Sequence, residues 1–287
     1  MSVSFVLITF LTQMAAGMMI TISLLPPAEI DHRFFRSISF WCMVFVGLAL
    51  LTIRYSTFSL PGVFGMGGEI SDTSGLLRKS RLLFFGFFLL SALLWARLQF
   101  LQIIVSRIEV ILISLVGLVA IVTHSLAFRP ALPPLWVQNV LIPLHFISTG
   151  MILGAFLTGM IFGHFYLVNT DMPKKLLLRM AWILIAVLAL RIVSVGTTLL
   201  LHHEFLHHDM GTEFLTVLTS FAGHGIFFWQ RILVGLAIPA VVVGLIWGTA
   251  RIGSNQSATG IMYVAISFVF IGELVARYLF LLSAIPL

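Results

Sequence analysis

The chain has very little charge. Only 9% of its 287 residues are Asp, Glu, Lys or Arg, whereas 60% are hydrophobic, and the mean hydropathy is +1.13. Soluble globular domains carry about 25% charged residues. The composition therefore excludes an ordinary soluble domain and predicts a polytopic membrane protein.

Cysteine is almost absent, since Cys42 is the only one and it stands inside an apolar stretch. A single thiol excludes a disulfide framework and an iron–sulfur cluster held by this chain's own cysteines. The basic residues are spread over loops and helix ends and are not interleaved with aromatic residues. Because nucleic-acid binding needs a concentrated basic surface, we expect no nucleic-acid partner.

Eight apolar runs fill most of the sequence, and each approaches or exceeds the roughly 20 residues that span a bilayer. They lie near residues 3–25, 38–58, 82–105, 108–128, 138–167, 177–201, 222–250 and 260–285. Arg107 and Glu109 must then mark a tight turn between the third and fourth runs, and otherwise the number of spans falls to seven. The first run lacks a basic region before it and a cleavage site after it, so we expect a retained helix. The predicted fold is all-α, a single integral membrane domain over residues 1–287.

The distribution of Lys and Arg over short loops predicts the orientation in the membrane. With the amino terminus outside, the inner loops hold Arg33, Arg36, Arg107, Lys174, Lys175, Arg179 and Arg251, and the outer loops hold Arg78, Lys79, Arg81 and Arg129. We therefore expect both termini on the outer, periplasmic side.

Two long outer loops differ in character. The loop at 59–81 is rich in glycine and ends in basic residues, which suggests a docking role. The loop at 202–221 contains four histidines and three carboxylates without Lys or Arg: His202, His203, Glu204, His207, His208, Asp209 and Glu213. A solvated, partner-facing loop is the favoured interpretation. A metal site is the alternative, because residues four apart share a helical face.

Ionisable groups within the apolar runs gather toward the outer face. A charge at the centre of a membrane helix costs at least about 2.5 kcal/mol, so such groups usually face a bundle interior or a cavity. Counting residues along each helix places one set in the outer half: Gln13, Arg54, His124, His145, His224, Arg231, Glu273 and Arg277. The inner half offers only Arg97 and His164, with Arg191 near the midplane, and none has an evident acidic partner. A proton pump or an ion-coupled transporter needs a relay through the full depth, so both are disfavoured.

Two interpretations of the outer groups stay open. Glu273 and Arg277 are four residues apart, which allows an ion pair along one helical face. That pair is either purely structural or part of a site in which Glu273 accepts a proton. His124, His145 and His224 also make a b-type haem site conceivable on sequence grounds, because two histidines on facing helices can ligate one iron. A capped or interface histidine is the more common case, so we expect no haem.

Glycines in the fifth run recur at small-residue spacings, at Gly150, Gly154, Gly159 and Gly163. Such spacings allow two membrane helices to approach closely. They predict a packing contact and carry no chemistry.

Four segments, in order, resemble the membrane anchor subunits of the dimethyl sulfoxide reductase type, the DmsC group within the wider NrfD-like and polysulfide-reductase-like anchors. They are TFLTQMAAG at 9–17, then Trp136, Pro143, Phe146, Thr149, Leu153 and Gly154, then WQRI at 229–232, and GELVARYLF at 272–280. The family's His-Leu-Gly element after the second helix has no counterpart here, where Arg54, Tyr55 and Ser56 stand.

The resemblance implies an anchor in a bacterial or archaeal inner membrane. Such a subunit exchanges electrons between menaquinol or ubiquinol and a peripheral iron–sulfur subunit, which serves a molybdopterin catalytic subunit. Both partners would dock on the outer loops 59–81 and 202–221. The subunit is not a catalyst on its own.

Our leading hypothesis is therefore a quinone-reactive anchor of a multi-subunit oxidoreductase. The candidates for proton transfer in its site are Glu273, His145 and His224. The candidates for quinone binding are Gln13, Arg54, Arg231 and Arg277, and no metal ligand is predicted. A structural or assembly protein, or a carrier of small solutes, is the alternative from another class. A haem-binding membrane cytochrome is the third.

Overall fold

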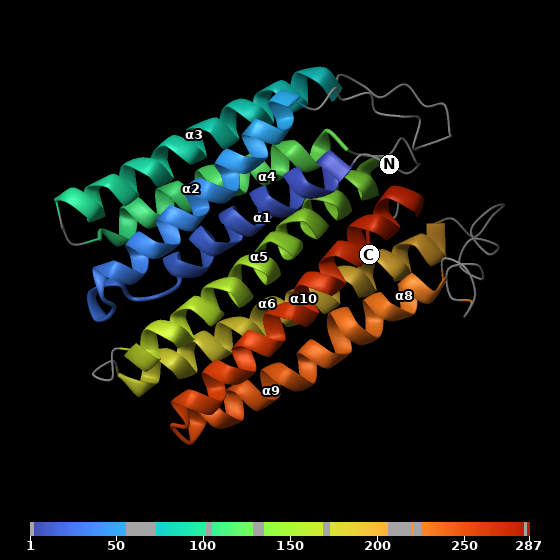
Figure 1. The fold of residues 1–287 in the computed structure, drawn as a ribbon. Helices are drawn as coiled ribbons and strands as arrows, with labels where there is room; N and C mark the ends of the chain where they lie inside the picture. The colour runs from blue at the N-terminus through green and yellow to red at the C-terminus, as the bar shows by residue number, and fades with distance from the viewer. Residues whose placement is uncertain are drawn as a thin grey trace.

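The computed structural model describes residues 3–55, 73–101, 105–128, 135–168, 173–205, 220, 225–283 and 286–287. The described residues form helices and no strand (Figure 1). In chain order the elements are α1 (Val3–Ser23), the short 3-10 helix η1 (Pro27–Glu29), α2 (His32–Tyr55), α3 (Thr73–Phe100), α4 (Arg107–Leu126), α5 (Leu135–Val168), α6 (Lys174–Phe205), α8 (Gly225–Ile232), the π-helix η2 (Leu233–Ala237), α9 (Ile238–Arg251) and α10 (Asn255–Ser283).

Eight spans are long and apolar enough to cross a membrane, and α8, η2 and α9 together form the seventh. The third and fourth spans are separate helices, because α3 ends at Phe100 and α4 begins at Arg107. Large apolar side chains such as Leu82, Leu115 and Val241 point outward from the bundle. Water tolerates such a surface poorly and lipid tolerates it well. The predicted all-α fold with eight spans suitable for a multi-pass membrane protein is confirmed.

Several predicted helix bounds were wrong. Helix α3 begins nine residues before the predicted start, so Arg78, Lys79 and Arg81 lie in its first turns and not in a loop. Helix α2 begins at His32, and α6 continues to Phe205, which removes residues 202–205 from the predicted histidine-rich loop. Hydropathy finds the apolar middle of a helix and misses polar end turns that emerge from the membrane. The remainder of both predicted loops lies outside the described residues, apart from Ser220.

Two groups of helices make up the bundle. Helices α1 to α4 pack against their neighbours in one group, and α5, α6, α8, α9 and α10 form the other (Figure 1). The main joint is the contact between α1 and α5, with α4 also touching α5. With an even number of spans, α1 begins and α10 ends at the same end of the bundle, which we call the terminal end. We call the other one the opposite end.

Glycine makes the joint between the two groups possible. A methyl group added to Gly154 of α5 would overlap the backbone of Gly17 and Met18 in α1, and one added to Gly17 would overlap the carbonyl of Gly150. The backbones can approach this closely only because neither helix has a side chain at the crossing. The predicted packing role of the glycines in α5 is confirmed at Gly150 and Gly154.

Replacing Gly154 by valine should therefore lower the stability of the bundle. The new side chain meets backbone, which cannot rotate away, so we expect a loss of at least about 2 kcal/mol. Thermal unfolding of the detergent-purified protein measures it. Gly244→Val in α9 is the matched control, because nothing lies within 4 Å of a Cβ added there. Equal melting temperatures for the two variants would contradict the close crossing.

Candidate functional site

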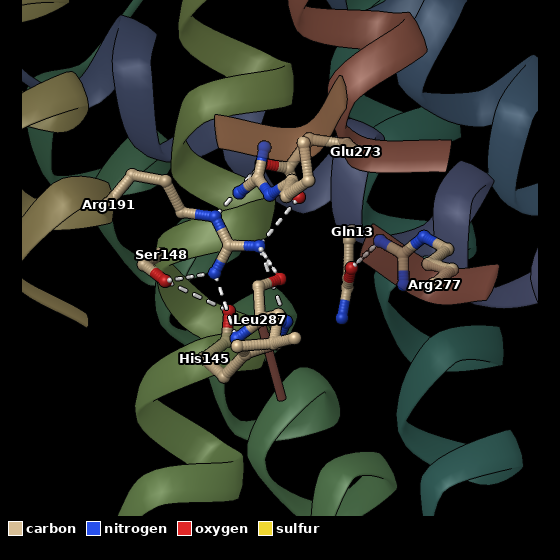
Figure 2. A network of polar contacts seen from close by, with 8 residues as sticks. Gln13, His145, Ser148, Arg191, Glu273, Arg277 and Leu287 are labelled. Atoms are coloured by element: carbon tan, nitrogen blue, oxygen red, sulfur yellow. Dashed lines mark hydrogen bonds and ion pairs between the residues drawn. The ribbon is translucent and has the colours of Figure 1, made fainter. Parts of the chain in front are cut away.

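Arg191 of α6 lies at the centre of a buried polar network in the second group of helices (Figure 2). Its guanidinium donates from Nε to Oε1 and from Nη2 to Oε2 of Glu273 in α10, both at 2.9 Å. This two-point geometry is the strongest that an arginine and a carboxylate can form. Arg191 is 0% exposed and Glu273 is 1% exposed. The pair thus joins α6 to α10 inside the bundle.

The remaining donors of Arg191 reach α5 and the end of the described chain. Nη1 lies 2.9 Å from His145 Nδ1 and donates to Ser148 Oγ at 3.2 Å, and Nη2 donates to the Leu287 carbonyl at 3.1 Å. A guanidinium has donors only, so His145 Nδ1 accepts in this arrangement and the ring proton of a neutral imidazole lies on Nε2. The 3.3 Å contact between Nη2 and Nε2 is then not a hydrogen bond.

Arg231 brings a second guanidinium to the same carboxylate, with Nη2 donating to Glu273 Oε1 at 2.9 Å. It lies one residue before the end of α8, directly ahead of the π-helix η2. A Cβ on Gly235 of η2 would lie 2.6 Å from Arg231 Nη1 and 2.8 Å from Gly272 Cα in α10. The absence of side chains at Gly235 and Gly272 makes room for the guanidinium beside α10. Such π-turns are frequent at functional sites.

The third guanidinium, that of Arg277 in α10, points to the other group of helices. It donates to the side-chain oxygen of Gln13 in α1 (Figure 2). Its Cζ atom lies 5.9 Å from the centroid of the Phe10 ring. The expected pair between Glu273 and Arg277 along α10 is not formed, because Glu273 takes its bonds from Arg191 and Arg231. The expectation that Arg191 has no acidic partner was likewise wrong.

The charges of the network do not cancel. Three arginines are buried, Arg191, Arg231 and Arg277, whereas Glu273 is the only buried acidic side chain among the described residues. Several buried nitrogen atoms also lack a hydrogen-bond acceptor in the described part of the chain: Arg231 Nε and Nη1, Arg277 Nε and Gln13 Nε2. Uncompensated charge and unpaired donors are costly in a bilayer. The arrangement is suited to an anion or to an oxygen that gains negative charge.

His124 of α4 lies in the other group of helices and has a different environment. Ser80 Oγ donates to the Leu77 carbonyl at 2.9 Å and lies 3.2 Å from His124 Nδ1. Because the serine proton is already used, Nδ1 donates to Ser80 and Nε2 keeps a lone pair. That Nε2 is buried and has no partner in the described part of the chain.

The structure brings five of the seven predicted site residues close to one another: Gln13, His145, Arg231, Glu273 and Arg277. Arg54 lies in the last turn of α2, where its side chain is not described, and His224 lies outside the described residues. Sequence reasoning missed Arg191 and Ser148. The missing signal was the partner in another helix, which spacing along one helix cannot reveal.

Two further residues of the inner half, Arg97 and His164, were also expected to have no acidic partner. Arg97 of α3 is paired with Glu109 of α4, so that expectation was wrong. His164 of α5 is exposed on the surface of the bundle. Among the described residues, no group of three or more His, Cys, Asp or Glu side chains is placed to hold a metal ion. Of the predicted histidine cluster, His207 and His208 lie outside this part of the chain, and the side chains of His202 and His203 at the end of α6 are not described.

Comparisons of the chain with protein family models, with curated proteins and with solved structures find no match. The resemblance to the anchor subunits therefore stays a prediction from sequence.

Removing the one buried carboxylate tests the charge arrangement. Glu273→Gln leaves three guanidinium groups without a counter-charge, so we expect a loss of about 3–5 kcal/mol in stability. Glu29→Gln is the control, because Glu29 forms a partly exposed pair with Lys175 at 3.0 Å, which contributes at most about 1 kcal/mol. Thermal unfolding in detergent measures both. An equally small effect of the two changes would contradict a buried, essential Glu273.

Proposed function

We propose that this protein is a quinone-reactive membrane anchor of an oxidoreductase complex, with its site at the buried arginines. The observation that carries the proposal concerns the described residues: three buried arginine side chains stand against one buried acidic side chain, beside nitrogen donors that have no acceptor there. A membrane protein tolerates this cost most readily where function needs it.

Quinol oxidation suits such a site. A quinol that becomes a quinone loses two protons and two electrons, and its oxygen carries negative charge once the first proton has left. Fixed guanidinium groups stabilise that charge without having to reorganise. The electrons would go one at a time to the iron–sulfur subunit, so that this chain needs no redox centre of its own.

The hydrogen-bond pattern supports a division of roles among the titratable groups. Both oxygens of Glu273 are engaged by arginines, so it serves best as the counter-ion that holds Arg191 and Arg231. His145 accepts from Arg191 at Nδ1 and so helps to hold that guanidinium in place. His124 Nε2 has a buried lone pair without a partner and is the best candidate for the proton acceptor.

The orientation belongs to the same proposal. We place the terminal end on the outer side of a bacterial or archaeal inner membrane, in line with the distribution of Lys and Arg. The iron–sulfur and molybdopterin subunits would then dock on the segments that follow α2 and α6, within the predicted loops 59–81 and 202–221. Menaquinol or ubiquinol would enter from the membrane.

Binding of a short-chain naphthoquinol or benzoquinol analogue to the purified protein tests the site. Arg277→Lys keeps one charge but loses the planar set of donors, and we expect its affinity to fall about tenfold or more. His124→Gln should keep binding within a few fold and slow the oxidation of quinol by the intact complex. Arg97→Lys, at the opposite end, is the control and should bind as the unmodified protein does.

Two results would contradict this assignment. One is the absence of saturable binding of either analogue to the unmodified protein. The other is the same affinity in Arg277→Lys and in the unmodified protein, when both show the same melting temperature.

Purification from native membranes tests the partners. An anchor should carry with it a ferredoxin-like subunit and a large molybdopterin subunit, identified by mass spectrometry and by molybdenum content. Recovery of the chain alone under mild detergent conditions would speak for a structural protein.

The same excess of buried positive charge would also serve a carrier of small anions, the second candidate. Uptake of radiolabelled organic anions into vesicles that contain the purified protein distinguishes the two. Saturable uptake without any quinol-analogue binding would favour the carrier.

A further inference from the structure

A long groove lies on the outer surface of the first group of helices, between α3 and α4. Its volume is about 870 Å³, and its walls include Leu83 and Leu90 of α3 and Leu112 and Val119 of α4. Arg97 and Glu109 lie at one end. The groove is therefore apolar along most of its length and polar at one end only.

The dimensions suit one hydrocarbon chain. On α3 the groove extends from Leu83 to Arg97, a separation of 14 positions, or roughly 21 Å of helix. One leaflet of the hydrocarbon core is about 15 Å thick. A chain that lies along the groove would therefore reach from the membrane surface past the midplane.

The polar end carries a positive charge. Arg97 pairs with Glu109, and their side chains are 35% and 22% exposed. The neighbouring Arg107 is exposed, and no carboxylate of the described residues lies within ion-pair distance of it. Two guanidinium groups against one carboxylate leave one positive charge, and arginine is well suited to phosphate oxygens.

Aromatic side chains mark this end as the membrane boundary. Phe40 and Trp41 of α2 contact each other, Phe40 contacts Trp95 of α3, and Trp95 contacts Phe100. Such aromatic groups gather at the level of the lipid headgroups. Trp95 precedes Arg97 by two residues, so the polar end of the groove lies where a headgroup would be.

We propose that the groove between α3 and α4 binds an anionic glycerophospholipid, with one acyl chain along the leucines and the phosphate at Arg97 and Arg107. Basic pockets between membrane helices bind anionic headgroups in this way. The site is separate from the buried arginines, which lie nearer the terminal end, so neither proposal depends on the other.

Native mass spectrometry of the detergent-purified protein tests the proposal. After delipidation, the protein is mixed with phosphatidylglycerol or with phosphatidylcholine of the same chain length. We expect one phosphatidylglycerol to be retained at about tenfold higher affinity than phosphatidylcholine. Arg107→Gln should abolish most of this preference. Arg107 stands between Ser106 and Ile108, which both line the groove. Arg251→Gln is the matched control, because Arg251 is also exposed at the opposite end but belongs to α9, which contributes no residue to the groove.

A second variant tests the groove itself. Leu112 lines the groove and is 57% exposed, whereas Leu245 of α9 is 54% exposed and does not line it. Leu112→Trp should fill the groove and lower lipid retention, and Leu245→Trp should leave retention unchanged. Equal retention of both lipids would overturn the proposal, as would equal retention by the two tryptophan variants. Displacement of the lipid by a neutral quinone at equal concentration would also overturn it.

Discussion

The two-point ion pair between Arg191 and Glu273 is the interaction on which the second group of helices depends. It connects two residues that are 82 positions apart in sequence, on α6 and α10, and Arg231 from a third helix binds the same carboxylate. His145 and Ser148 of α5 complete the set around Arg191. The hydrocarbon core of a membrane offers no water to a buried charge, so hydrogen bonds within the protein are strongly favoured. This requirement fixes how α5, α6, α8 and α10 are placed around one another.

Stability and function make opposite demands on this network. A structure selected for stability alone would match charges or replace them with apolar side chains, since a buried ion pair gains little over well-packed hydrophobic residues. Here the side chain of Glu273 faces three guanidinium groups, and Arg231 and Arg277 retain donors without acceptors in the described part of the chain. Under the proposed function this excess would serve a bound ligand, and the tight joint at Gly17 and Gly154 would help to hold the bundle despite its cost.

Much of the fold was predictable because hydropathy is a local property. Eight apolar runs predicted eight spans, and the glycine spacing of α5 predicted a close helix contact. The site was only partly predictable. Counting residues along each helix predicted that Gln13, His145, Arg231, Glu273 and Arg277 lie at a similar depth in the membrane. It could not predict which sides of the helices face one another. The pair of Glu273 with Arg277 was expected from their spacing along one helix. It is not formed, because Arg191 of α6 and Arg231 of α8 bind the Glu273 carboxylate instead. Arg191 appeared unpartnered for the same reason.

The depth of the network bears on how an anchor would work. Arg231 is six residues from the start of α8 and Arg277 six from the end of α10, so both lie roughly 9 Å from the terminal end. A quinone held there would be buried from water yet close to the face on which a partner docks. Protons released at this depth need to cross only the nearest part of the bundle, and His124 lies on that side, between Ser80 and Phe128. The opposite end, where Trp95 lies close to the polar end of the groove between α3 and α4, would then serve the contact with lipid headgroups. Electron transfer and membrane anchoring would thus occupy opposite ends of one bundle, which explains why the costly charges collect at only one of them.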